Sequence, residues 1–169
     1  MEQIDAYIDA HRDEYVERLR TLCRIPTVSA RGEHLDEGAA HVAGLLERFG
    51  AAVTVLNAES GFPLVVGTVQ GASPRTLLVY NHYDVVPPEP LADWSVPPFE
   101  AVVRDGRLIA RGACDNKADL VGRLCAAEAY LAVHGALPVA ITFVLDGEEE
   151  IGSPHLRAAV EANRDLLAA

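Results

Sequence analysis

Apolar residues recur every three or four positions in several stretches of the chain, with charged residues between them. This spacing places apolar side chains on one face of a helix. It predicts three helices, at residues 4–24, 35–49 and 116–134. Pro26 ends the first helix, because proline disfavours helix at the residue before it, and Gly50 and Gly135 are stop signals for the others. Ser153 and Pro154 predict the start of a last helix, with the serine as N-cap.

Shorter runs rich in β-branched and other apolar residues predict strands. The runs lie at residues 52–56, 64–69, 76–80 and 139–145, with turn-forming residues at 57–63. The Asp105–Gly106 pair predicts a hairpin whose strands are residues 101–104 and 107–110. Because the helix at 116–134 crosses between the strands at 76–80 and 139–145, these strands should be parallel. We therefore predict an α/β fold, a mixed and partly parallel sheet flanked by helices, in one domain over residues 1–169.

The composition narrows the classes of partner. A net charge of -11 and a pI near 4.9, without a basic cluster, argue against nucleic acid or an anionic membrane as partner. No apolar run approaches the ~18 residues of a membrane span, and the first residues lack a signal-peptide pattern. Three cysteines without a Cys-x-x-Cys pair indicate neither a disulfide framework nor a thiolate zinc site. We expect a cytoplasmic protein.

Polar residues follow the two predicted parallel strands. His82 and Asp84 come just after the strand at 76–80, and Glu148 to Glu150 come just after the strand at 139–145. In such sheets the carboxyl ends of the strands meet at one edge, where sites form. Asp115 begins the helix that returns to the second strand, and we expect it near the same edge. Taken together, these residues favour one metal site over three incidental features.

Each feature also has a structural explanation when it is taken alone. A His-x-Asp pair in a loop is usually incidental, Asp115 suits a helix N-cap, and the acidic run suits a helix N-terminus. As a set, imidazole and carboxylates suit a hard or borderline divalent ion. A bridging carboxylate can hold two ions about 3.5–4 Å apart, and a glutamate can transfer a proton to a leaving amine. Spacing alone does not choose among the three glutamates.

Four stretches of the chain carry a resemblance to a known family. They are residues 81–87, 93–99, 105–117 and 148–153. Over nearly the whole chain the sequence resembles the zinc aminoacylase and metallopeptidase family. That family includes carnosinase-type dipeptidases, glutamate carboxypeptidases, acetylornithine deacetylase and succinyl-diaminopimelate desuccinylase. The resemblance implies hydrolysis of the amide bond of a dipeptide or an N-acyl amino acid.

The resemblance also implies roles for individual residues. The implied metal ligands are His82, Asp115 and Glu150. Asp115 would bridge two Zn²⁺ ions, with Co²⁺ or Mn²⁺ as alternatives, and a cis peptide bond to Asn116 is expected. Asp84 would orient the histidine, and Glu149 would be the general base. Lys117 occupies a motif position without an implied role.

The chain also departs from the family pattern. The family uses a further carboxylate and a late histidine as metal ligands, and it has a lid and dimerisation domain; this chain ends at Ala169 before them. We expect the N-terminal part of a catalytic domain whose isolated chain is inactive, and full-length relatives that are homodimers. The alternative is a non-catalytic α/β module that binds metal weakly and needs a partner segment. A serine hydrolase is disfavoured, because the chain has no Gly-x-Ser-x-Gly sequence.

Overall fold

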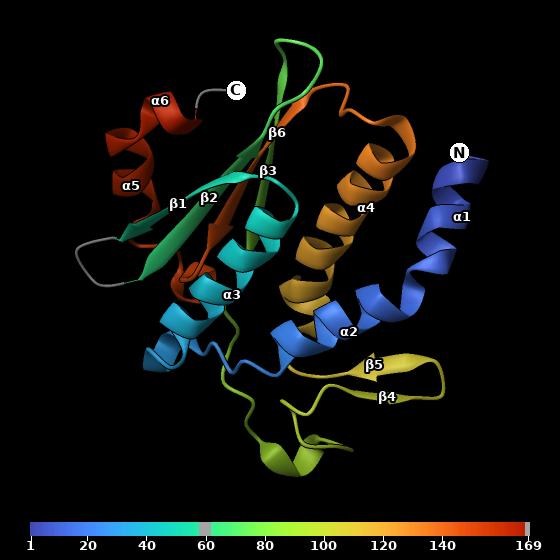
Figure 1. Ribbon diagram of the computed structural model, residues 1–169. Helices are drawn as coiled ribbons and strands as arrows, with labels where there is room; N and C mark the ends of the chain where they lie inside the picture. The colour runs from blue at the N-terminus through green and yellow to red at the C-terminus, as the bar shows by residue number, and fades with distance from the viewer. Residues whose placement is uncertain (58–61, 168–169) are drawn as a thin grey trace.

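The computed structural model describes residues 1–57 and 62–167, so most of the turn predicted at residues 57–63 lies outside the described residues. The helices are α1 (Glu2–Ala10), α2 (Arg12–Cys23), α3 (Leu35–Arg48), α4 (Ala118–His134), α5 (Leu156–Ala162) and α6 (Arg164–Leu167). The strands are β1 (Ala52–Asn57), β2 (Pro63–Val69), β3 (Thr76–His82), β4 (Val102–Arg104), β5 (Arg107–Ile109) and β6 (Ala140–Asp146). Figure 1 shows their arrangement.

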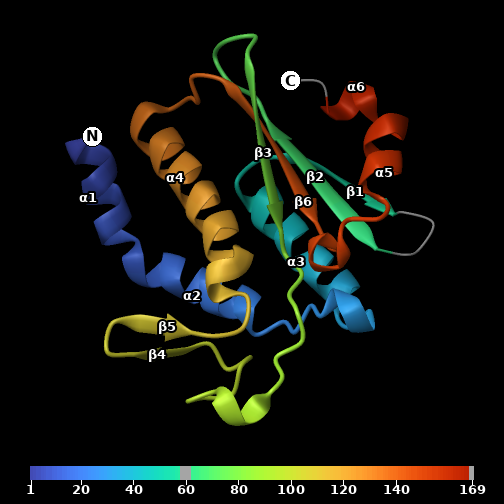
Figure 2. The same cartoon turned by 180° about the vertical axis from the view of Figure 1, so that it is seen from behind.

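The four longer strands form one mixed sheet in the order β1-β2-β6-β3. Strand β2 pairs antiparallel with both β1 and β6, whereas β3 pairs parallel with β6. Helix α4 makes the connection between β3 and β6, which is the arrangement that the sequence predicts (Figure 2). The short strands β4 and β5 form a separate antiparallel hairpin, as expected. The predicted α/β class with a partly parallel sheet is therefore confirmed.

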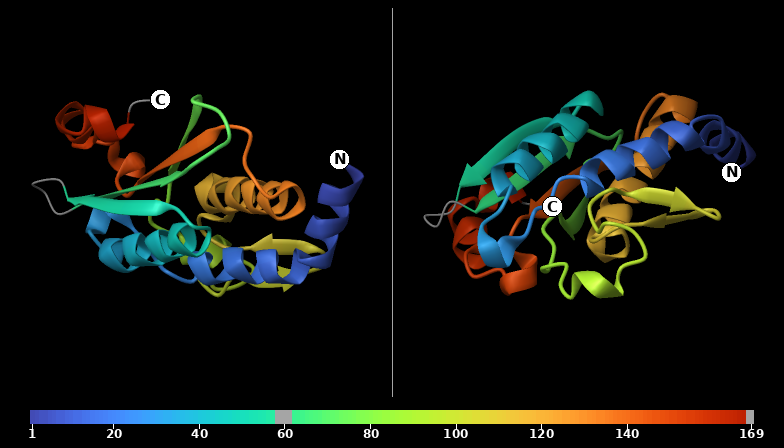
Figure 3. Two further views of the ribbon diagram at one scale, coloured as in Figure 1. Left: turned by 45° about the horizontal axis from the view of Figure 1, so that its top comes forward. Right: turned by 90° about the horizontal axis from the view of Figure 1, so that it is seen from below.

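Helices cover both faces of the sheet, with α3 and α4 on one side and α5 and α6 on the other (Figure 3). Successive residues of a strand point to opposite faces, so β2 and β6 contribute to two cores. Val65 and Phe143 belong to the larger cluster with α2, α3 and α4, and Val66 and Val144 pack against α5 and α6. No helix among the described residues is long and apolar enough to cross a membrane.

The prediction of a single helix at residues 4–24 is wrong, because the structure has two helices that meet at His11. The His11 ring stacks on Tyr7, with 4.0 Å between ring centroids, and its Nδ1 lies 2.8 Å from the Tyr7 carbonyl oxygen. Apolar positions continue at helical spacing through both helices. Their pattern therefore contains no signal for the bend.

Ser153 is not the N-cap of the helix that follows it, because that helix, α5, begins at Leu156. Ser153 has a positive φ of 48°, and its hydroxyl donates a 2.7 Å hydrogen bond to the buried carboxylate of Asp146. The hydroxyl is therefore used to close the turn after β6. At the start of α5, the backbone N–H of His155 donates a 2.7 Å hydrogen bond to the carboxylate of Glu148 instead.

Candidate metal centre

The parallel pairing of β3 and β6 brings the polar ends of both strands to one edge of the sheet. His82 is the register partner of Asp146, and each is the last residue of its strand. Directly beyond them, the N–H of Tyr83 donates to the carbonyl oxygen of Asp146 at 2.9 Å. The two segments that leave the sheet here therefore start side by side, as the strand order predicts.

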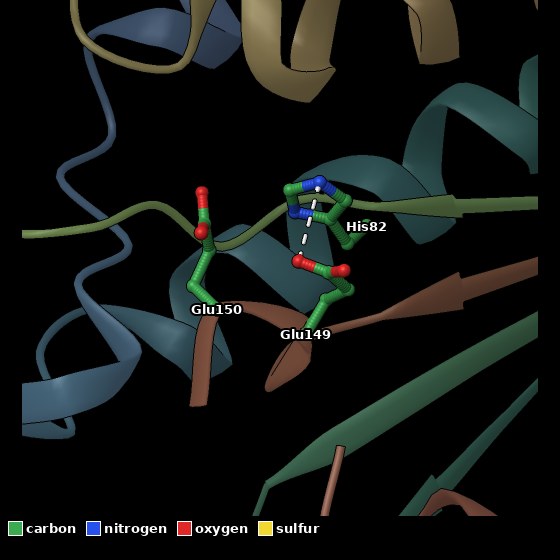
Figure 4. Close-up of side chains that lie close together, drawn as sticks. All are labelled: His82, Glu149 and Glu150. Carbon is green, nitrogen blue, oxygen red and sulfur yellow. Dashed lines mark ion pairs between the residues drawn. The ribbon is translucent and has the colours of Figure 1, made fainter. Parts of the chain in front are cut away.

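His82 is the centre of the group. Its ring is nearly buried, and its Nε2 atom lies 3.1 Å from Asp115 Oδ1 and 3.7 Å from Glu149 Oε2. Figure 4 shows His82 together with the side chains of Glu149 and Glu150, which come from the turn after β6. One donor atom from each of these three residues lies within 4.8 Å of the others. Asp115 adds a fourth donor next to the histidine.

Asp84 connects two of the converging segments. It is fully buried, and its Oδ1 lies 3.3 Å from His82 Nδ1. The same carboxylate accepts hydrogen bonds from the backbone N–H groups of Glu149, at 3.2 Å, and Glu150, at 3.0 Å. His82 Nδ1 also lies 3.2 Å from the backbone carbonyl oxygen of Asp84, so one buried residue holds both the imidazole and the turn that carries the two glutamates. The spacing of residues along the sequence does not predict the hydrogen bonds between Asp84 and the glutamate turn.

Asp115 reaches the edge of the sheet from the Ala113–Lys117 segment, which leads directly into α4. Its peptide bond to Asn116 is cis, as the family resemblance predicts. The Asp115 side chain is 76% exposed, in contrast to the almost buried His82 that it contacts. Burial therefore does not hold this carboxylate, and its position must depend on the segment that carries it.

The crowding of carboxylates changes the proton affinity of the group. Burial of His82 disfavours its charged form, but the hydrogen bond and the negative charge of Asp84 favour that form more strongly. With smaller contributions from other acids, they raise the pKa of His82 to about 9. Burial, followed by the negative charge of Asp115, raises the pKa of Glu150 above its usual range. A divalent cation bound here would have to displace the His82 proton and would favour the ionised form of Glu150.

The structure separates the three consecutive glutamates. Glu148 is 3% exposed, and its carboxylate accepts two hydrogen bonds from His155, from the backbone N–H at 2.7 Å and from Nδ1 at 2.9 Å. Glu148 therefore acts as an acid that accepts a hydrogen bond at a helix N-terminus, the structural role expected for the acidic run. Glu149 and Glu150 remain beside His82, and by distance alone either could be a ligand.

The donor set fits a hard or borderline divalent cation. Its members are one imidazole nitrogen and several carboxylate oxygens, without a thiolate, in a group that carries more negative than positive charge. Zn²⁺, Co²⁺ and Mn²⁺ all accept this mixture of donors. The second nitrogen of the imidazole is already held by Asp84, as metal-binding histidines require.

Two further residues support the site, although no pattern in the sequence predicts a role for them. Asp146 is buried at the end of β6, and its carboxylate accepts hydrogen bonds from Tyr80 Oη at 3.0 Å, Ser153 Oγ at 2.7 Å and the N–H of Glu148 at 3.0 Å. Lys117 is fully buried, and its Nζ donates to two backbone carbonyls at the end of α2. A charged residue at the end of an apolar run was the available signal for Asp146.

Residues 78–169 match peptidase family M20/M25/M40. The human Beta-Ala-His dipeptidase is 32% identical, and the match covers 98% of this chain and 36% of that protein. The Cys-Gly metallodipeptidase of Schizosaccharomyces pombe is 31% identical, with 98% of this chain and 38% of that protein covered.

Solved structures give the same result. A crystal structure of an M20 family metallo-carboxypeptidase from Sulfolobus solfataricus superposes with a TM-score of 0.86 at 36% sequence identity. The superposition covers 92% of this chain and 36% of that one. The chain thus spans little more than a third of the length of the relatives that it matches.

Proposed function

Because the chain belongs to peptidase family M20/M25/M40, we propose that residues 1–169 form the N-terminal part of the catalytic domain of a two-metal amidohydrolase. The whole protein would cleave the amide bond of a dipeptide or an N-acyl amino acid. The observation that carries the proposal is the contact of one buried histidine with three carboxylates from three segments of the chain. Such a group has the donors for a divalent cation and an acid to hold the imidazole.

We assign His82, Asp115 and Glu150 as metal ligands, with Asp115 shared between two Zn²⁺ ions. Co²⁺ and Mn²⁺ are the alternatives. When bound, the ions would polarise the amide carbonyl and acidify a water molecule. Asp84 accepts a hydrogen bond from His82 Nδ1, which keeps Nε2 directed toward Asp115. Its hydrogen bonds to the turn after β6 hold Glu150 on the same side.

Glu149 is the residue that we assign as general base. Its carboxylate lies beside His82, and its side chain is 43% exposed, so it can reach both water and a substrate. In this role it takes a proton from the attacking water and delivers that proton to the leaving amine. The backbone N–H of Glu149 donates a hydrogen bond to Asp84, which fixes the backbone that carries this carboxylate.

The same geometry supports a second proposal about the 169-residue chain. With these assignments, each ion would have two ligands among the described residues, His82 and Asp115 for one, and Asp115 and Glu150 for the other. Catalytic zinc usually has three protein ligands. We therefore infer weak metal binding and no turnover for this polypeptide alone, as in a module that requires a further segment. Tight binding of two ions with dipeptide hydrolysis would contradict this inference.

Substitution of the two glutamates in the full-length protein tests the assignment. Glu149→Ala should retain both metals and lose turnover, whereas Glu150→Ala should lose one metal. Metal content is measured by mass spectrometry after dialysis, and hydrolysis is measured with β-alanyl-histidine. Glu161→Ala, an exposed position on α5, is the matched control. If Glu149→Ala lost a metal while Glu150→Ala kept both, the assignment would be wrong by one residue.

A further inference from the structure

A chain of hydrogen bonds runs from helix α4 to the residue that follows Asp115. Arg123 Nη1 donates to the carbonyl oxygen of Tyr80 at 2.9 Å and to Asn81 Oδ1 at 2.8 Å. Asn81 Nδ2 donates in turn to Asn116 Oδ1. The three side chains come from α4, from β3 and from the segment before α4. We call Arg123, Asn81 and Asn116 the amide relay.

The direction of the relay is set at Arg123. A guanidinium group only donates hydrogen bonds, so the amide of Asn81 must turn its oxygen toward Arg123. Its NH₂ group then faces Asn116, which must present its own oxygen. Asn81 is 1% exposed, so an unpaired amide here would cost about 1–3 kcal/mol. Each member therefore determines the orientation of the next.

The relay ends next to a carboxylate that burial does not hold. Asp115 is mostly exposed, yet its Oδ1 lies 3.1 Å from His82 Nε2. On the other side of Asn116, buried Lys117 binds the carbonyl oxygens of Leu22 and Ile25, at 3.1 and 2.8 Å. The residues that follow Asp115 are therefore tied to the sheet through Asn116 and to α2 through Lys117.

We propose that the amide relay of Arg123, Asn81 and Asn116 is a positioning group that holds Asp115 against His82 for metal binding. The proposal rests on the proposed function, in which Asp115 is a shared ligand. Asp84 already fixes the imidazole and the glutamate turn. The relay does for Asp115 what Asp84 does for the other donors. Arg123 also lies 3.9 Å from Asp119 on its own helix, a contact too long and exposed to account for the geometry.

Two pairs of substitutions in the 169-residue chain test the relay. Asn116→Leu has a similar shape and removes the acceptor, whereas Asn116→Asp retains it. Arg123→Met removes the donor, whereas Arg123→Lys keeps a cationic donor. The two disruptive changes should weaken Co²⁺ binding about tenfold, as for other residues that support metal ligands, and the conservative changes should restore it. Binding is followed by the visible absorption of Co²⁺, which also reports a change in coordination.

Further measurements separate the relay from the metal assignment. Arg157→Met, at an exposed arginine on α5, should leave Co²⁺ binding unchanged. Asp115→Asn should weaken binding at least as much as Asn116→Leu. Normal binding by the disruptive variants, together with loss in Asp115→Asn, would overturn the relay and leave the site standing.

Hydrogen exchange decides the remaining case, in which Asp115→Asn has no effect on Co²⁺ binding and the ligand assignment fails. In the metal-free chain, exchange in residues 113–117 should become about tenfold faster in both disruptive variants and stay slow in both conservative ones. Unchanged exchange in the disruptive variants would overturn the relay independently of the metal. Faster exchange restored by Arg123→Lys and Asn116→Asp would support it.

Discussion

Replacing Asp84 with asparagine is the sharpest test of how the site is held together. Three N–H groups approach this carboxylate: the backbone groups of Glu149 and Glu150, at 3.2 and 3.0 Å, and Nδ1 of His82, at 3.3 Å. Asparagine has nearly the same shape as aspartate, but it has one oxygen and an NH₂ group. In Asp84→Asn, at least one donor must therefore face another donor inside the protein.

The expected loss of stability follows from these contacts. Leaving one buried N–H without an acceptor costs about 1–3 kcal/mol. The hydrogen bonds that remain lose their charged acceptor and become roughly half as strong, which adds about 1 kcal/mol. Asp84→Asn should therefore lower the free energy of unfolding by about 2–4 kcal/mol, a large part of the stability of a domain of this size.

Urea unfolding at neutral pH, followed by far-ultraviolet circular dichroism, measures this change. Asp13→Asn is the matched control, because Asp13 lies exposed on α2 and the same substitution there should change stability by less than about 0.5 kcal/mol. The result that refutes the reasoning is a loss in Asp84→Asn as small as in the control. The buried carboxylate would then not be what holds the glutamate turn.

Two further predictions concern stability. Gly147→Ala should lower the free energy of unfolding in urea by about 1–3 kcal/mol, because the new Cβ would lie 2.3 Å from Tyr83 Oη, which is fixed by its hydrogen bond to the Pro63 carbonyl oxygen. Gly122→Ala, with open space around it on α4, should raise that free energy by roughly 0.5–1 kcal/mol. Equal effects of the two substitutions would contradict the steric argument. Burial lowers the pKa of His41 below its ordinary value of 6.5, so the unfolded chain binds more protons there and stability falls as the pH drops through that region. His41→Gln should flatten this fall between neutral and mildly acidic pH, and an unchanged slope would argue against it.

The fold could be predicted from the sequence wherever the regular spacing of apolar residues indicates which side chains are buried. Helix α4 and the strands β3 and β6 lie within about two residues of their predicted ends, the usual uncertainty of such boundaries. The bend at His11 could not be predicted, because it depends on one ring that stacks on Tyr7 and binds its carbonyl. The start of α5 was missed because Ser153 bonds to Asp146, a partner that becomes available only in the folded chain.

The candidate site shows the same division. The strand order predicts that His82 and the glutamate turn meet at one edge, and they do. The choice between Glu148 and its two neighbours needed either a family pattern or the structure, since it depends on the contact of Glu148 with His155. The supporting residues Asn81 and Asp146 lie at the ends of apolar strands. Their partners are a guanidinium and an amide for Asn81, and two hydroxyls and a backbone N–H for Asp146. Spacing in the sequence carries no information about such partners.

The supporting contacts divide the site into two parts that share His82. Asp84 is fully buried and binds the imidazole and the glutamate turn directly, so its loss must disturb several donors at once. The amide relay acts on the Asp115 side alone, and it begins at Arg123, whose side chain is 47% exposed. A change at Arg123 should therefore move one donor and disturb the fold less than a change at Asp84. Metal binding and folding stability are thus coupled more strongly through Asp84 than through Arg123, because Asp84 is fully buried whereas Arg123 is half exposed.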